Sequence, residues 1–307
     1  MRISYHDRVA IITGAGSGLG RSYALFLGSR GAKVVVNDLG VSGDGTGQSE
    51  APAQMVVDEI KSRGGLAVAN FDSVAEIGSA QRIVNDALEH FGTIDILINN
   101  AGILRDKTFL KMPIGDFELV LKVHLLGSVY VTRAAFPVMK EKAYGRIVMT
   151  TSVAGLFGNF GQTNYSTAKL GIVGFMNSLK LEAEKYNILI NTVAPLAGTK
   201  LAAQAGVFPE EILHLLKPEL VTPLVAYLCS EECRSSGDII SAGGGYFAKV
   251  QMVEGRGLRV NPGEEITPER IAENYAQITE MEGAVPFWSA KHELMEVLEP
   301  LMNLSNR

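Results

Sequence analysis

Short runs rich in Val and Ile alternate with longer helical stretches over most of this 307-residue chain. Each run is apolar at nearly every position, which is typical of strands that are covered on both faces. A helix between consecutive strands is the connection that parallel pairing requires. We therefore expect an α/β fold, a doubly wound parallel sheet of the Rossmann type. The expected strands are Val9–Thr13, Val34–Asn37, Leu66–Asn70, Ile94–Ile98, Arg146–Thr151, Ile188–Val193 and Ile239–Ser241.

The composition changes after Gly243, where the alternation of strands and helices stops. Thr267 precedes Pro268 at an expected first helical position, and Ser289 precedes a second amphipathic stretch. We therefore expect one α/β domain over residues 1–245 and a C-terminal helical extension over residues 246–307.

The charge balance excludes several classes of partner. Lys and Arg number 28 against 33 Asp and Glu, and no basic run is present, so we expect no nucleic-acid partner. No apolar run approaches the roughly 20 residues of a membrane-spanning helix, and the N-terminus does not resemble a signal peptide. The sequence ends Leu304-Ser305-Asn306-Arg307, which is not the Ser-Lys-Leu peroxisomal signal. We expect a soluble cytoplasmic protein.

Cys229 and Cys233 cannot build a disulfide framework, which favours a reducing compartment. They are four residues apart on an expected helix. No cluster of His or Cys completes a zinc site around them. We therefore expect both side chains to serve packing, and no metal.

A glycine-rich turn follows the first expected strand and opens the first helix, at Thr13-Gly14-Ala15-Gly16-Ser17-Gly18-Leu19-Gly20. Glycines there allow the backbone to approach a pyrophosphate at the positive end of the helix. Asp38 ends the second strand, near the offset of about 20 residues at which an acidic side chain binds the adenosine ribose. Its carboxylate would repel a 2′-phosphate, so NAD is favoured over NADP.

A candidate catalytic group lies farther along the chain. Tyr165 and Lys169 are four apart at the start of an apolar helix, which puts them on one face. An ammonium beside a phenol lowers the pKa of the phenol, as an acid/base for alcohol oxidation requires. Ser152 follows the fifth strand, and its hydroxyl is expected in the same crevice.

With these motifs, residues 7–245 resemble the short-chain dehydrogenase/reductase family, and Asn99-Asn100-Ala101-Gly102 adds to the resemblance. The resemblance implies that Tyr165 is the general acid/base, that Lys169 is its partner and a ligand of the nicotinamide ribose, and that Ser152 binds the substrate oxygen. It implies a homodimer. It also assigns the cofactor to Gly14, Ser17, Gly18, Leu19, Gly20, Asp38, Asp72, Ser73, Asn100, Gly102, Tyr165, Lys169, Leu196, Ala197 and Thr199.

Two positions depart from the usual pattern of the family. His124 stands where Asn is common in the proton relay, although its backbone carbonyl remains available to a relay water, and Pro195-Leu196 replaces Pro-Gly. Both departures, and the segment Gly158–Gln162, resemble the (3R)-hydroxyacyl-CoA dehydrogenase branch carried by peroxisomal multifunctional enzymes of type 2. The resemblance implies NAD-dependent oxidation of (3R)-3-hydroxyacyl-CoA to 3-oxoacyl-CoA. Because no hydratase or sterol-carrier segment is present, we expect a free-standing bacterial relative.

Two other functions remain open from the sequence. One is a dehydrogenase of another secondary alcohol, such as a hydroxysteroid, because fold and catalytic residues are shared while substrate contacts are not. The other is a non-catalytic NAD-binding interaction protein, against which the intact Ser152, Tyr165 and Lys169 argue.

Overall fold

The structure, a computed structural model, describes residues 3–204, 209–261 and 263–305. The chain divides into two compact units, Met1–Lys249 and Val250–Arg307. The first contains the sheet and the helices that cover it. The described part of the second contains the helices α11 (Pro268–Glu273), α12 (Tyr275–Ile278) and α13 (Ala290–Ser305).

The first unit is built on an eight-stranded sheet with the order β3-β2-β1-β4-β5-β6-β7-β8. All pairs from β3 to β7 are parallel, which confirms the predicted doubly wound fold. The strand order reverses between β1 and β4, and ligands bind at the carboxyl ends of strands beside such a switch point. The parallel strands are β1 (Val9–Thr13), β2 (Lys33–Asn37), β3 (Leu66–Asn70), β4 (Ile96–Asn99), β5 (Gly145–Thr150), β6 (Ile188–Pro195) and β7 (Ile239–Gly243).

The eighth strand, β8 (Tyr246–Val250), was not expected from the sequence. Gly244 and Gly245 join it to β7, and both have positive φ, at 57° and 84°. A two-residue turn of this kind makes a β-hairpin. The boundary predicted after residue 245 therefore falls inside a hairpin, whereas the two compact units divide after Lys249.

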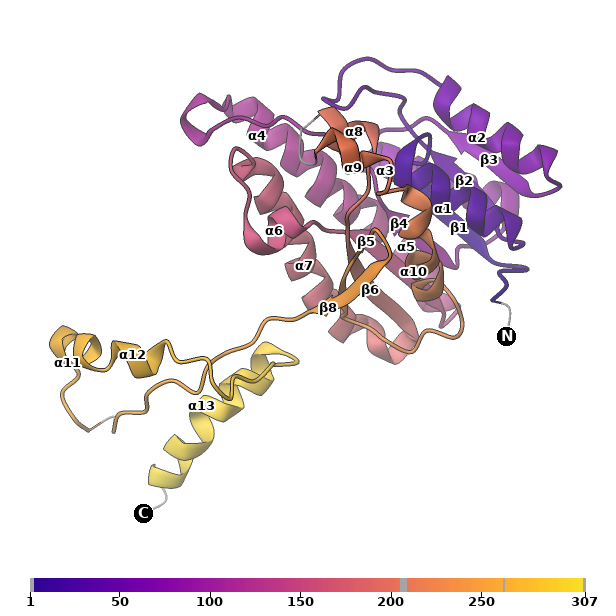
Figure 1. Ribbon diagram of the computed structural model, residues 1–307. Coiled ribbons are helices and arrows are strands. Elements are labelled where there is room, and N and C mark those ends of the chain that lie inside the picture. Colours follow the sequence, from indigo (N-terminus) through magenta and orange to yellow (C-terminus); the bar gives the residue numbers. More distant parts are fainter. Residues whose placement is uncertain (1–2, 205–208, 262, 306–307) are drawn as a thin grey trace. The chain divides into compact units, whose positions relative to one another are not determined.

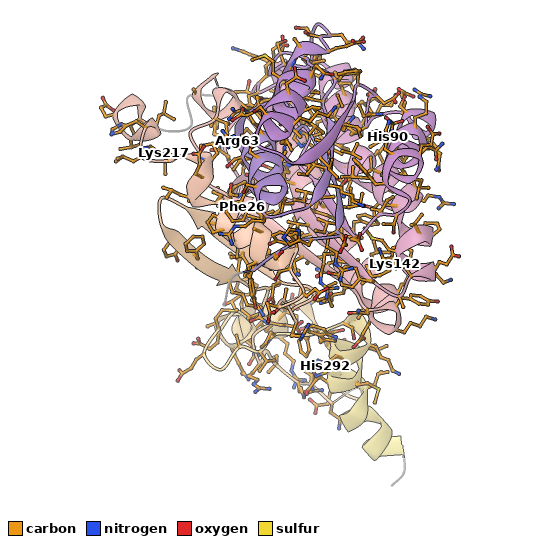
Figure 2. All side chains as sticks on the ribbon, turned by 90° about the vertical axis from the view of Figure 1, so that its right-hand side faces the viewer. Phe26, Arg63, His90, Lys142, Lys217 and His292 are labelled. Atoms are coloured by element: carbon orange, nitrogen blue, oxygen red, sulfur yellow. The ribbon has the colours of Figure 1, made fainter. Side chains whose placement is uncertain are left out.

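Helices cover both faces of the sheet (Figure 1). In Figure 2, Phe26 of α1 (Gly18–Ser29) and Arg63, which follows α2 (Ala51–Ser62), lie on one side. His90 of α3 (Ile77–Phe91) and Lys142, which follows α5 (Gly127–Glu141), lie on the other. α7 (Thr163–Ala183) packs against α5, and α10 (Thr222–Leu228) packs against α1.

Alternate strand residues form the core beneath α1, α2 and α10. A strand directs every second side chain to the same face, and buried members on this face come from all seven parallel strands, with two each from β1, β2 and β4. Each buried aliphatic side chain contributes about 1.5–3 kcal/mol relative to its exposed state. The cluster includes Ala10, Ile12, Val34, Val36, Ile96 and Ile98 from the strands, with Tyr23, Leu27, Val57, Ile60 and Val225 from the helices.

One long helix carries a local irregularity. α4 (Ile114–Leu121) continues through a π-helical turn, η2 (Lys122–Leu126), into α5. The helix from Ile114 to Glu141 has 28 residues and a mean hydropathy of 1.3 in its most apolar window, so by length and composition it could cross a membrane. This differs from the sequence expectation, although core helices of soluble proteins meet the same criterion. Here α4 packs on α7, and α5 packs on α3.

The two cysteines do not share a helix, so that expectation is wrong. α10 ends at Leu228, Cys229 follows as its C-cap, and Cys233 lies beyond the next turn. Both side chains are buried in the core. The described residues contain no cluster of three or more His, Cys, Asp or Glu side chains placed to hold a metal ion.

The remaining short elements connect the layers. In the second unit, α11 begins where the sequence predicts, because the Thr267 side chain accepts a hydrogen bond from the Arg270 amide at 3.3 Å. In the first unit the short elements are η1 (Phe109–Lys111), α6 (Val153–Phe157), η3 (Glu184–Tyr186), α8 (Lys200–Gln204), α9 (Glu210–Leu213) and η4 (Pro218–Leu220).

Candidate active site

A cavity of about 950 Å³ lies at the carboxyl ends of the parallel strands. Residues that end or follow β2, β3, β4, β5 and β6 line it, as expected for a doubly wound sheet. Every site residue predicted from the sequence lines this cavity except Gly20. Those residues are Gly14, Ser17, Gly18, Leu19, Asp38, Asp72, Ser73, Asn100, Gly102, Ser152, Tyr165, Lys169, Leu196, Ala197 and Thr199.

The glycine-rich turn is packed too closely for side chains. Gly14 has φ +63°, and a Cβ on it would lie 2.7 Å from the Ala101 Cα atom. A Cβ on Gly20 would lie 2.2 Å from the Gly14 carbonyl oxygen, so Gly20 keeps α1 against the turn without lining the cavity. Asn100 Nδ2 donates to the carbonyls of Thr13 and Gly14, at 3.1 and 3.0 Å. The bare backbone at the start of a twelve-residue helix fits a pyrophosphate.

Asp38 lies at the end of β2 and reaches back to this turn. Its Oδ2 accepts a hydrogen bond from the Gly16 amide at 2.7 Å, and its Oδ1 accepts one from the Gly40 amide at 2.7 Å. Each carboxylate oxygen retains a free lone pair. The side chain therefore fits the hydroxyls of an adenosine ribose held next to the turn.

Asp72 and Ser73 border the same end of the cavity. The Asp72 carboxylate forms an ion pair with Arg82 and accepts a hydrogen bond from Asn70 Nδ2 at 3.1 Å. Asn37 Nδ2 donates to the Asp72 carbonyl at 2.9 Å, which ties the segment after β3 to β2. These contacts hold the backbone of residues 72 and 73 in place beside Asp38.

The candidate catalytic residues come from two helices. Ser152 is the N-cap of α6, where its Oγ accepts from the Ala154 amide at 3.1 Å. Tyr165 and Lys169 lie one turn apart on α7, and the Lys169 Nζ is 5.6 Å from the centre of the Tyr165 ring. Lys169 is 3% exposed, and its Nζ donates to the Thr150 carbonyl at 2.6 Å. The structure thus brings all three residues to one cavity.

The electrostatics of this group differ from the sequence expectation. Burial raises the pKa of Tyr165, a hydrogen bond with Ser152 lowers it in part, and the charge of Asp106 raises it further. Burial also lowers the pKa of Lys169 to about 7. Desolvation therefore dominates the electrostatics of Tyr165, and its pKa is raised where the sequence predicted a lowering by the ammonium.

His124 is buried on the π-helical turn η2. Its Nε2 lies 3.1 Å from the Ile103 amide nitrogen and 2.8 Å from the Ile103 carbonyl oxygen. Burial, then the charge of Lys169, lowers the pKa of His124 well below its usual value, so the imidazole is neutral. The His124 carbonyl, expected to hold a relay water, accepts a hydrogen bond from Ser128 Oγ at 2.7 Å.

The loop after β6 covers the glycine-rich turn. The Leu196 amide donates to the Ala242 carbonyl at 2.7 Å, which extends the pairing of β6 with β7. A Cβ on Gly18 would lie 3.2 Å from the Thr199 Cγ2. The loop with Leu196 in place of glycine therefore still reaches the cavity.

Several cavity residues were not assigned from the sequence. The loop after β2 contributes Leu39 and Val41, and Asn159 and Gln162 line the wall near Tyr165. In the sequence, the segment Gly158–Gln162 carries a resemblance to the family branch and no assigned role. Its polar side chains Asn159 and Gln162 are the feature that could have indicated a place in the cavity wall.

Comparison with known proteins places the chain among dehydrogenases. The profile of the short chain dehydrogenase family matches residues 8–206. A Mycobacterium tuberculosis protein named as a short-chain type dehydrogenase/reductase is 49% identical over 278 residues, covering 91% of this chain and 96% of that protein.

Two further comparisons extend the likeness. Peroxisomal multifunctional enzyme type 2 of Drosophila melanogaster is 44% identical over 305 residues, and the chain spans 50% of its length. Its full-length structure aligns with a TM-score of 0.81 at 39% identity, covering 97% of this chain and 51% of that one. A 7α-hydroxysteroid dehydrogenase solved with NADH aligns with a TM-score of 0.70 at 28% identity, covering 79% of this chain and 95% of that one. The chain belongs to the short-chain dehydrogenase family and is an oxidoreductase that uses a nicotinamide cofactor.

Proposed function

We propose that this protein oxidises (3R)-3-hydroxyacyl-CoA to 3-oxoacyl-CoA with NAD. The observation that carries the proposal is that Ser152, Tyr165 and Lys169 share one cavity with Asp38. The likeness to the Drosophila multifunctional enzyme over 98% of this chain supports the acyl-CoA class. The resemblance of Gly158–Gln162 to the (3R)-hydroxyacyl-CoA dehydrogenase branch supports it further.

Each of the three catalytic residues has a distinct role in this proposal. Tyr165, in its phenolate form, accepts the hydroxyl proton of the substrate, and Ser152 donates a hydrogen bond to the same oxygen. Lys169 binds the nicotinamide ribose and supplies positive charge when it is protonated. Bound NAD supplies the acceptor for the hydride. Because Tyr165, Ser152 and the dinucleotide approach the carbon from fixed directions, only one epimer is productive; the choice of 3R rests on the resemblance.

The choice of NAD rests on Asp38. Its carboxylate already accepts two backbone hydrogen bonds and would repel a 2′-phosphate in the same place. The hydroxysteroid dehydrogenase that aligns with this chain was solved with NADH, which supports the same choice. We expect kcat/KM to be at least tenfold higher with NAD than with NADP, and Asp38→Ser to narrow that ratio. Equal use of both cofactors by the wild type would contradict the assignment.

The substrate is tested by following NADH formation with both epimers of a 3-hydroxyacyl-CoA. We expect turnover of the 3R epimer, none above background with 3S, and none with the 3R epimer when Tyr165 is replaced by Phe. A 7α-hydroxysteroid is the second substrate to assay, because a dehydrogenase of that class aligns with 79% of the chain. Faster oxidation of the steroid, or preference for 3S, would overturn the acyl-CoA proposal.

A further inference from the structure

A buried chain of polar side chains forms part of the cavity wall next to Tyr165. Gln162 is the N-cap residue of the 21-residue helix α7, is 4% exposed, and lines the cavity. Its Nε2 donates to Asp106 Oδ2 at 2.6 Å, and its Oε1 accepts from Asn159 Nδ2 at 2.9 Å. The amide of Gln162 is therefore held at both ends.

Asp106 determines which way this amide points. An ionised carboxylate only accepts hydrogen bonds, so the nitrogen of Gln162 must face Asp106 and the oxygen must face Asn159. The amide nitrogen carries two hydrogens, and Asp106 Oδ2 takes one of them. The second N–H of Gln162 is then a donor of fixed orientation in the cavity wall.

The backbone around Asp106 is itself fastened to the start of α7. The Lys107 amide donates to the Gly161 carbonyl at 2.9 Å, and Asn164 Nδ2 donates to the Arg105 carbonyl at 3.0 Å. Arg105 in turn forms an ion pair with Asp116 at 2.5 Å. These contacts fasten the backbone on both sides of Asp106 and so hold Asp106 against Gln162.

Gln162 stands one helical turn before Tyr165, on the same cavity wall. The charge of Asp106 raises the pKa of Tyr165, which reflects how close this polar chain lies to the reacting phenol. A donor one helical turn from the catalytic phenol, on the same cavity wall, suits an acceptor a few bonds away from the alcohol carbon.

We propose that Gln162 donates a hydrogen bond to the carbonyl oxygen of the substrate thioester, with Asp106 and Asn159 orienting its amide. This proposal rests on the proposed function, because in a 3-hydroxyacyl thioester the carbonyl lies two carbons from the carbon that is oxidised. A secondary alcohol without that carbonyl leaves the donor unpaired. A site built to bind a polar group discriminates strongly against the analogue that lacks it.

The test compares two substrates in the wild type and in Gln162→Leu. One is a (3R)-3-hydroxyacyl-CoA, and the other is an unactivated 2-alkanol of similar chain length. Losing one neutral hydrogen bond should lower kcat/KM for the thioester by about tenfold. The kcat/KM for the alkanol should stay within about twofold, and the Kd for NAD should not change.

Asp106→Asn provides a second variant that retains Gln162. Asparagine offers both a donor and an acceptor, so the amide of Gln162 is no longer held in one orientation. Because the charge of Asp106 also raises the pKa of Tyr165, this variant is read as the ratio of kcat/KM for the thioester to kcat/KM for the alkanol. We expect that ratio to fall by about threefold to tenfold, since the hydrogen bond to the thioester is weakened rather than removed.

The possible outcomes separate the two proposals. Gln162→Leu could lower kcat/KM equally for both substrates, or leave kcat/KM for the thioester unchanged. Either result would overturn the role of Gln162 while leaving the dehydrogenase proposal intact. Failure of the wild type to oxidise the thioester, with turnover of the alkanol, would overturn both.

Discussion

The imidazole of His124 stands edge-on to the phenol ring of Tyr165, with ring centroids 5.2 Å apart and ring planes at 84°. The same imidazole touches the backbone of the segment after β4, because a Cβ on Gly102 would lie 2.2 Å from His124 Cε1. The buried His124 side chain thus packs between the phenol of Tyr165 and the backbone at Gly102. The imidazole of His124 therefore fits only because residue 102 has no side chain.

This pairing predicts a compensating double substitution. Gly102→Ala should lower kcat/KM at least tenfold, because the added methyl group displaces the imidazole and with it Tyr165. Adding His124→Asn should recover part of the loss, since the smaller side chain frees the space. Steady-state kinetics of the two single variants and the double variant measure this coupling.

Gly115→Ala is the matched control, because a Cβ there meets nothing within 4 Å. It should leave kcat/KM within about twofold of the wild type. If the double variant instead loses as much kcat/KM as the two single variants combined, the two positions act independently and the predicted coupling is wrong.

Tyr165 and Lys169 have different proposed roles, so their substitutions should affect kcat and the Kd for NADH differently. Tyr165→Phe should lower kcat by about 10²-fold or more, as expected for loss of a general acid/base, with little change in the Kd for NADH. Lys169→Ala should lower kcat and also weaken NADH binding, because the ammonium binds the ribose and also lies beside the phenol. Turnover and NADH fluorescence titration measure the two effects.

Thr167→Ala is the control on the same helix, because its Oγ1 donates only to the Thr163 carbonyl and the residue is exposed. Thr167→Ala should change neither kcat nor the Kd for NADH. A Tyr165→Phe variant that keeps more than about a tenth of the rate would assign the proton transfer to another residue.

The low pKa of Lys169 predicts a dependence of stability on pH. The folded protein has a Lys169 pKa of about 7 against 10.5 for an ordinary lysine, so between these values the unfolded state binds one more proton. This group therefore makes the free energy of unfolding rise with pH from about 7 toward 10.5, and its buried charge is most costly below pH 7.

Lys169→Met should accordingly be more stable than the wild type at pH 6 by an amount on the order of a few kcal/mol, and the difference should shrink toward pH 10. Urea unfolding of both proteins without cofactor at several pH values measures the difference. A difference that is constant with pH would show that Lys169 titrates normally in the fold.

The exposed apolar surface of α7 predicts a homodimer. Leu170 and Leu181 are 46% and 44% exposed, and their spacing of three helical turns puts them on one face. The most apolar window of the helix from Ile114 to Glu141 is only 39% buried. We expect light scattering to give a particle of twice 33.0 kDa, and Leu170→Glu to shift it toward the monomer. A stable 33.0 kDa wild-type particle at micromolar concentration would contradict this expectation.

Features carried by short stretches of chain were predictable from the sequence. The strands β1, β2 and β4 have buried aliphatic residues in nearly continuous runs, and the glycine-rich turn joins a strand to a helix within eight residues. Tyr165 and Lys169 share a helix face because four residues make about one turn. The strand β8 was missed because its residues are largely exposed and follow two glycines, which look like the end of a domain.

The tertiary structure alone decided which distant residues meet and how buried they are. Asp106 and Gln162 are 56 residues apart, and Ile103 and His124 are 21 apart, so no local pattern reveals either contact. The sequence also predicted a lowered pKa for Tyr165, whereas burial raises it. Spacing along the chain determines which side chains share an element, but desolvation and long-range contacts exist only once the elements have packed.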